Sequence, residues 1–203
     1  MRRVFLTAVL ALALPLAAYA HNVEFTDHSG TLTGSAAGLT LIGSKLTEVD
    51  GLGGLGLIQG TLGSMSFTTG MLTSGSLMNG GTFGAGGTFV ITGNGTSGIP
   101  NTTLFTGSFS GPVSWTPVTL ADGTHNYTLS GAITGTWYNG RTVDGVTTLI
   151  AINAGKSGFR GSLTFDSGET ILNTSAVPEP GTLLLFGTGS VGLAGIVRRK
   201  LKA

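Results

Sequence analysis

The chain has 203 residues, of which 36 are glycine, 9% are charged and none is cysteine. The lack of cysteine excludes disulfide scaffolds, thiol proteases and cysteine-based zinc sites. The formal net charge is +1, but six of the ten basic residues lie near the two ends of the chain. Residues 21–177 carry four basic residues against eight acidic ones, a net charge of −4, so we expect no binding to nucleic acid.

Residues 1–20 have the pattern of a secretory signal peptide. The doublet Arg2-Arg3 gives a positive start, residues 4–16 are apolar, and Ala18-Tyr19-Ala20 is a small-x-small cleavage site. We expect cleavage between Ala20 and His21, so that the mature chain begins at His21. The arginine doublet also partly matches a twin-arginine signal. Both export routes stay open, and the minimal positive start favours the general secretory one.

Residues 21–176 are predicted to form one β-rich domain. Between residues 127 and 137 the larger side chains recur at every second position, which places them on one face of a strand. These alternating positions are Tyr127, Leu129, Gly131, Ile133, Gly135 and Trp137. Asn139-Gly140 follows and predicts a two-residue type I′ turn, in which both residues have positive φ, and residues 141–153 then return as the partner strand.

Several further segments have the composition of short strands bounded by Gly, Pro, Asn or Asp. They are residues 87–93, 102–111, 112–120, 159–166 and 169–173. Residues 38–87 are richer in glycine and less regular, and no fixed period recurs in them. The expected fold class is therefore all-β, a sandwich or open barrel of short antiparallel strands. Unpaired strand edges leave fibre-forming assembly open.

The C-terminal segment, residues 177–203, has three parts. Val177, Pro178, Glu179 and Pro180 come first, and the two prolines favour an extended backbone. Gly181–Val197 then contains no charge and spans about 26 Å as a helix, close to the thickness of a hydrocarbon core. Arg198, Arg199 and Lys200 follow, and the positive-inside rule keeps this end in the cytoplasm. We expect a transmembrane helix with the body outside.

This tail resembles the PEP-CTERM sorting signal of exported bacterial proteins, and the resemblance is limited to the C-terminal segment. The resemblance implies that an exosortase, a membrane-embedded cysteine protease or transpeptidase, recognises Val177, Pro178, Glu179 and Pro180 and cuts near them. Arg198, Arg199 and Lys200 would be the cytoplasmic basic anchor. The resemblance further implies an inner-membrane precursor that is delivered to the cell surface or the extracellular polysaccharide matrix.

Residues that suggest chemistry are few. Gly51–Gly56 formally matches a dinucleotide fingerprint, but no amphipathic helix follows it, so we predict a glycine-rich turn. After signal cleavage, His21 would present an imidazole and an α-amine, the start of a copper site that needs a second histidine such as His28 or His125. We interpret these three histidines as exposed polar residues and expect no metal and no cofactor.

Asp50, Asp122 and Asp144 each precede glycine, and Asp166 lies two residues before Gly168. We interpret all four as turn residues, although a close carboxylate pair is what a glycosidase requires. Trp115, Trp137, Tyr127 and Tyr138 offer either a sugar-stacking platform or core packing, and we favour packing.

Together these observations predict an exported, transiently anchored, non-enzymatic β-rich protein of the cell surface or extracellular matrix, with a structural or adhesive role. A carbohydrate-binding module for exopolysaccharide is the alternative, followed by a secreted polysaccharide-acting enzyme. The expected partners are an exosortase, the membrane through the C-terminal helix and extracellular polysaccharide.

Overall fold

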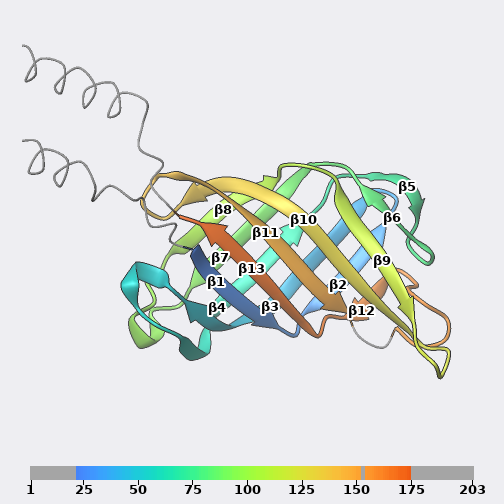
Figure 1. Cartoon of the computed structure of the whole chain (residues 1–203), viewed down its shortest axis with the longest axis horizontal. Coiled ribbons are helices and arrows are strands. Elements are labelled where there is room, and N and C mark those ends of the chain that lie inside the picture. The colour runs from blue at the N-terminus through green and yellow to red at the C-terminus, as the bar shows by residue number, and fades with distance from the viewer. Residues whose placement is uncertain (1–21, 152–153, 175–203) are drawn as a thin grey trace, which may run out of the picture. The chain divides into compact units, whose positions relative to one another are not determined.

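The computed structural model describes residues 22–151 and 154–174, and His21–Thr174 form one compact unit. The described residues make one sheet of 13 antiparallel strands (Figure 1), so the predicted all-β fold is confirmed. The strands are β1 Asn22–His28, β2 Thr31–Ser35, β3 Gly38–Asp50, β4 Ile58–Thr68, β5 Leu72–Ser76, β6 Gly80–Phe83, β7 Gly86–Gly93, β8 Thr103–Phe109, β9 Val113–Thr119, β10 His125–Trp137, β11 Thr142–Ala151, β12 Ser162–Thr164 and β13 Ser167–Asn173. Two short 3-10 turns are η1 Leu52–Gly54 and η2 Thr96–Gly98.

Eight of these strands close into a barrel. Their order around the barrel is β10, β11, β13, β1, β3, β4, β7 and β8, and β8 pairs back with β10. The closing strand β10 has partners on both edges, since Leu129 lies opposite Leu149 of β11 and Ile133 lies opposite Phe109 of β8. Closure leaves no free edge along the ring. The last strand, β13, lies between β1 and β11 and so completes the ring (Figure 1).

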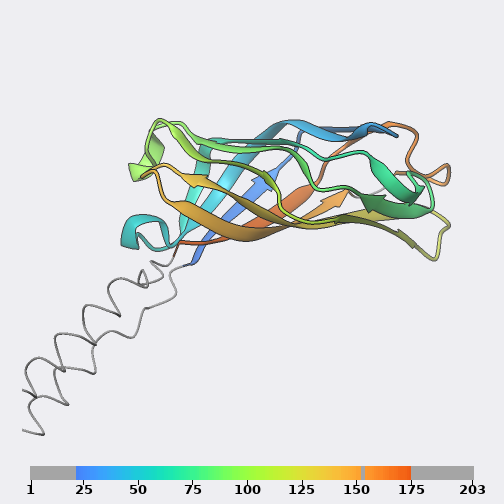
Figure 2. The same ribbon diagram turned by 90° about the horizontal axis from the view of Figure 1, so that it is seen from above.

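Two long strands carry the sheet beyond the barrel. β3 pairs with β1 through Lys45–Asp50 and with β2 through Gly38–Ile42. β10 pairs with β8 through Ile133–Trp137 and with β9 through His125–Ser130. Because both strands change partner along their length, β2 and β12 extend one layer and β9, β6 and β5 extend the other (Figure 2). We call this two-layered part the split end.

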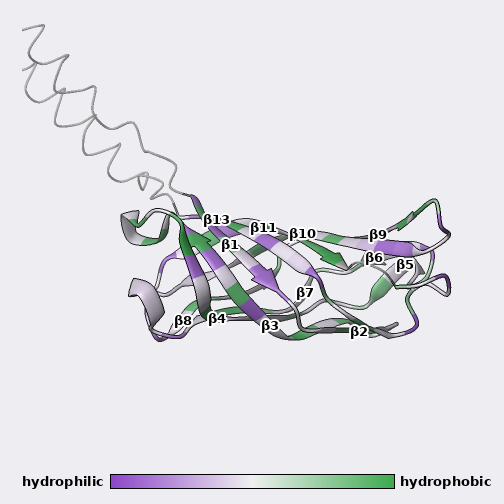
Figure 3. Ribbon diagram, turned by 90° about the horizontal axis from the view of Figure 1, so that it is seen from below, coloured by the Kyte–Doolittle hydropathy of each residue, from purple (hydrophilic) through white to green (hydrophobic). Residues whose placement is uncertain are grey.

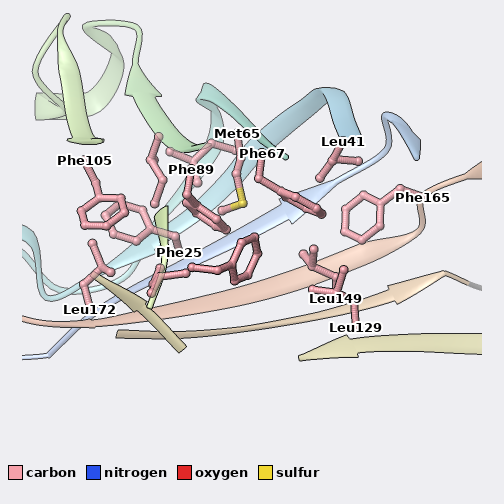
Figure 4. Packing of buried hydrophobic residues seen from close by; sticks show 14 of the residues in the cluster. Phe25, Leu41, Met65, Phe67, Phe89, Phe105, Leu129, Leu149, Phe165 and Leu172 are labelled. Carbon is pink, nitrogen blue, oxygen red and sulfur yellow. The ribbon is translucent and has the colours of Figure 1, made fainter. Parts of the chain in front are cut away.

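The barrel interior is filled by large apolar side chains (Figure 4). Four phenylalanines from β4, β7 and β8 form its centre, with ring centroids 5.7–6.1 Å apart, and they are Phe67, Phe89, Phe105 and Phe109. Burying each of these rings contributes about 1.5–3 kcal/mol relative to leaving it in water. The alternation predicted for residues 127–137 is confirmed, because Tyr127, Leu129, Ile133 and Trp137 all point inward.

A second aromatic cluster fills the split end. Trp115 stacks on Tyr127 with ring centroids 4.7 Å apart, and Phe159 packs edge-on against both rings. Trp115 Nε1 donates to the carbonyl of Leu77 at 2.8 Å, and the Tyr127 hydroxyl donates to the carbonyl of Met78 at 2.8 Å. The same hydroxyl accepts a hydrogen bond from the Phe159 amide at 3.0 Å. The cluster therefore fixes two loops to the sheet.

The β10–β11 hairpin was predicted correctly, but its turn type was not. The Gly140 amide donates to the Trp137 carbonyl at 2.8 Å, and the Trp137 amide donates to the Arg141 carbonyl at 2.8 Å. Gly140 has φ +84°, whereas Asn139 has no positive φ. The two-residue type I′ turn is therefore wrong, and the loop has three residues with glycine in the left-handed position. Asn139 Oδ1 instead accepts a hydrogen bond from the Arg141 amide at 3.1 Å, which stabilises this longer turn.

Candidate functional site

The predicted processing residues lie outside the described part of the chain. They are Ala20 and His21 at the signal cleavage site, Val177, Pro178, Glu179 and Pro180 in the sorting motif, and Arg198, Arg199 and Lys200 in the basic anchor. Among the described residues, no helix is long and apolar enough to span a membrane. The predicted helix Gly181–Val197 also lies outside the described residues, so this finding does not test it.

The described residues nearest to these segments lie at one end of the barrel. Asn22 of β1 is paired with Asn173 of β13, so the chain enters and leaves the domain side by side. Three loops surround this place, formed by residues 51–57, 94–102 and 138–141. We call it the exit end, and it lies opposite the split end (Figure 1).

The exit end contains a cavity of about 400 Å³. It is lined by Val23, Gly51, Gly53, Gly54, Trp137, Tyr138, Asn139 and Thr174, none of which is charged. Trp137 is almost buried and packs edge-on against Phe25 at 6.0 Å, whereas Tyr138 is 46% exposed. The cavity thus has an uncharged lining of mixed polarity that includes one accessible aromatic ring.

Loop 51–57 adds exposed aliphatic side chains to the exit end. Leu55 is 43% exposed and Leu57 is 60% exposed, while Leu52 is buried in the core. A Cβ placed on Gly98 would lie 3.6 Å from Leu55 Cδ1, so this loop touches the loop 94–102. The turn that holds these leucines is the predicted glycine-rich one, because Gly51, Gly53 and Gly54 all have positive φ and strand β4 follows rather than a helix.

Sequence reasoning missed a long uncharged stretch. No charged residue occurs anywhere from Gly51 to Ala121, a stretch that includes strands β4 to β9. The outer wall formed by β4, β7 and β8 carries mostly hydroxyl side chains, interrupted by Val90 on β7 between Ser66 and Thr106. We call it the hydroxyl face, and it comprises Ser64, Ser66, Thr68, Thr88, Thr92, Thr103, Thr106 and Ser108. A count of charges along the sequence could have found the uncharged stretch, but not the adjacency of the three strands.

The wall formed by β13, β1 and β3 carries four acidic residues, and Figure 3 shows hydrophilic positions on β1 and β3. Glu24 of β1 lies opposite Asp50 of β3, and Glu48 and Glu169 lie close by. Partial burial raises the pKa of Glu24, and the carboxylates of Glu169, Asp50 and Glu48 raise it further. Glu24 and Asp50 lie opposite each other on neighbouring strands, and neither of them lines the exit-end cavity.

Asp27 is a buried acid that the sequence analysis overlooked. It continues the inward alternation of Val23 and Phe25 along β1, and its side chain is fully buried. Ser44 Oγ donates a hydrogen bond to Asp27 Oδ2, while Asp27 Oδ1 has no partner among the described residues. Burial raises the pKa of Asp27 to about 6, although the hydrogen bond from Ser44 and the charge of His28 lower it. Period-two alternation through Val23 was the signal for this position.

The four predicted turn aspartates have different positions. Asp122 lies in the β9–β10 turn, where hydrogen bonds from the amide and hydroxyl of Thr124 lower its pKa. Asp50 ends β3 and Asp166 lies between β12 and β13, as expected for connections. Asp144 is a correction, because it lies inside β11 opposite Thr134. The Gly145 that follows is required by close strand packing, since a Cβ there would lie 2.4 Å from the Ile171 carbonyl.

Core packing is confirmed for Trp115, Tyr127 and Trp137, which are at most 5% exposed, and only Tyr138 of the four predicted aromatic residues is accessible. His28 is exposed, with Nδ1 3.1 Å from the Asp166 carbonyl. His125 is half-buried, with Nδ1 3.1 Å from Thr119 Oγ1. Within residues 22–151 and 154–174, no group of three or more His, Asp or Glu side chains is arranged to hold a metal ion.

The fold therefore defines a closed antiparallel barrel whose two chain ends leave together. Residues 176–200 match the family model of the PEP-CTERM protein-sorting motif, which confirms the predicted signal. The match includes Val177 to Pro180 and Arg198 to Lys200, and it implies an exported protein with a membrane-anchored precursor that an exosortase processes. No curated protein and no solved structure matches the chain.

Proposed function

We propose that this protein is a non-catalytic structural or adhesive component of the cell surface or extracellular matrix. The hydroxyl face is the observation that carries the proposal. It presents uncharged Ser and Thr side chains over three adjacent strands, and Thr68 Oγ1 and Thr88 Oγ1 lie 3.1 Å apart across two of them. The hydroxyl groups of such a face can donate hydrogen bonds to a hydrated polysaccharide and accept them from it, directly or through water. Because the face carries no charge, this contact should depend little on salt.

The distribution of acidic groups supports a non-enzymatic role. Glu24 and Asp50 lie on the outer barrel wall and are not among the residues that line the cavity, and Asp27 is enclosed within the core. A hydrolytic pair needs a cleft that orients a sugar between the two carboxyls. The exit-end cavity is lined instead by three glycines, two aromatic residues, a valine, a threonine and an asparagine.

Fractionation of the native host, with mass spectrometry of the mature chain, tests the destination. We expect a chain that begins at His21 and ends near Val177 to Pro180, in the surface or matrix fraction. A full-length chain that stays in the inner membrane would contradict the proposal.

Gel-shift electrophoresis with the host's own polysaccharide tests the adhesive role. Thr88 and Thr106 are exposed members of the hydroxyl face on β7 and β8. Changing both to Val removes two hydroxyls at nearly constant shape and should weaken the shift. Thr31→Val, at an exposed position of β2, should not. If the unaltered chain is not retarded, the adhesive role is wrong.

A further inference from the structure

We propose that the exit end of the barrel rests on a lipid bilayer surface while the precursor is anchored, with Leu55, Leu57 and Tyr138 inserted at the interface. Exposed apolar side chains occur singly on most proteins and need no explanation. Here Leu55 and Leu57 share one loop, and the cavity lining places that loop beside Tyr138 and Thr174. They therefore border the point from which the chain continues to its sorting segment.

The length of chain beyond Thr174 supports a bilayer as the partner. Gly181, the first residue of the uncharged stretch of the sorting segment, is seven residues further along the sequence. Seven residues span at most about 25 Å when fully extended. The inference rests on the anchored precursor. Only when the sorting segment is anchored in the bilayer does this short connection limit the distance between the barrel and the membrane. A tether of that length gives even a weak surface contact a high effective concentration.

The chemistry of the exit end favours lipid over saccharide. Leucine side chains have no hydrogen-bonding groups, so the exposed Leu55 and Leu57 cannot form hydrogen bonds with the hydroxyl groups of a sugar. At a bilayer interface the same side chains lose unfavourable contact with water. Tyrosine is enriched at this depth because its ring is apolar and its hydroxyl remains hydrated.

Charges near the exit end set the type of surface. Loops 51–57 and 94–102 contain no charged residue, and loop 138–141 contains Arg141. Glu24 and Asp50 lie on the wall behind loop 51–57 and would be repelled by anionic lipid. We therefore expect the contact to depend on apolar insertion and to form on zwitterionic lipid.

The lack of native cysteine permits a direct test. The full chain carries a single cysteine at Leu57→Cys, or at Val118→Cys as a control, and is labelled with an environment-sensitive fluorophore. Val118 is 50% exposed and lies in β9 at the split end. Each chain is reconstituted into phosphatidylcholine vesicles that contain a lipid with a nitroxide quencher near its headgroup. We expect a blue-shifted and quenched probe at residue 57 and a water-like probe at residue 118.

A second pair of variants tests the role of the leucines. Leu55→Ser should reduce quenching of the probe at residue 57, whereas Ile42→Ser should leave it unchanged. Ile42 is 57% exposed and lies where β3 pairs with β2, away from the exit end. Equal effects of the two substitutions would contradict the proposed contact.

The outcomes separate this inference from the proposed function. A chain that floats with the vesicles but has water-like probes at both positions retains its anchor and overturns the lipid contact. A probe at residue 57 that is shielded only when exosortase is added indicates a protein contact and also overturns it. A chain that does not float with the vesicles overturns the anchored precursor itself, and the lipid contact with it.

Discussion

Ser44 Oγ on β3 donates a hydrogen bond to Asp27 Oδ2 on the neighbouring strand β1, inside the barrel. The two residues lie beside irregular register on both strands, since the β1–β3 pairing shifts between Thr26 and Asp27. Thr147 Oγ1 of β11 and Thr170 Oγ1 of β13, the other neighbour of β1, lie 2.9 Å apart and are also buried. The interior thus contains two buried polar pairs among its apolar side chains, and Asp27 is the only buried acid among the described residues.

This arrangement predicts that the barrel is more stable at mildly acidic pH. Burial raises the pKa of Asp27 from 3.8 to about 6, so between these pH values the folded chain binds more protons than the unfolded chain. Stability contributed by Asp27 is therefore present below about pH 4 and is lost as pH rises to about 6, a change of about 3 kcal/mol at most. Urea unfolding of residues 21–174 across this range measures it.

Asp27→Asn should remove most of that pH dependence, because the amide cannot ionise. The control is Asp144→Asn, at an exposed position of β11, which should preserve it. A pH profile that is the same in Asp27→Asn and the unaltered domain would show that Asp27 is not the titrating group.

Tyr127→Phe should destabilise the domain by about 1–3 kcal/mol, because it leaves the Met78 carbonyl and the Phe159 amide without their shared partner. Tyr138→Phe removes an exposed hydroxyl and should change stability by less than about 0.5 kcal/mol. Thermal unfolding of the two variants provides the comparison. Similar melting temperatures would mean that the Tyr127 hydroxyl does not hold the two loops.

Gly140→Val should cost about 1 kcal/mol or more, because a β-branched residue resists the φ of +84° that the three-residue turn imposes. Gly111→Val is a matched control. A Cβ at Gly111 has no neighbour within 4 Å, and its φ is not in the left-handed region. Equal unfolding midpoints for the two variants in urea would rule out strain at Gly140.

Processing should depend on Pro178-Glu179-Pro180, whereas membrane insertion should not. Insertion draws on the apolar stretch Gly181–Val197 and on the basic residues after it. Changing all three motif residues to Ala should therefore leave a full-length, membrane-bound precursor in a host with an exosortase, as measured by immunoblotting of membrane and surface fractions.

Changing Arg198, Arg199 and Lys200 to Ala is the companion experiment. It should disturb orientation and retention first and cleavage only as a consequence. Release of the triple-Ala motif variant at the normal rate would mean that the tail is a plain membrane anchor.

Local patterns predicted the parts of this protein that depend on neighbouring residues. The alternation from Tyr127 to Trp137 placed the inward face of β10, and the three-part tail identified the sorting signal. Ring closure was not predictable, because it depends on pairs such as Asn22 with Asn173 that are far apart in the sequence. The turn type failed for a different reason, since the preference of Asn139-Gly140 for a two-residue turn was overridden by the pairing of Trp137 with Arg141.

The interior position of Asp27 and the hydroxyl face show a second limit. Alternation along a strand predicts which side chains share a face. A single acid at an inward position, such as Asp27, could equally indicate that the strand is irregular and that the acid points outward. The uncharged stretch can be recognised as one hydroxyl face only when β4, β7 and β8 are known to be adjacent. The exit-end surface likewise depends on three loops that are separate in the sequence.

The position of β13 between β1 and β11 has a consequence for the timing of export. A chain that crosses the membrane from its N-terminus delivers residues 167–173 last among the strands, and the gap between β1 and β11 stays open until they arrive. The sorting motif begins at residue 176, shortly after that strand ends at Asn173. Completion of the barrel and presentation of the processing signal are therefore nearly simultaneous events. A chain that stalls before this point would be both unclosed and uncut.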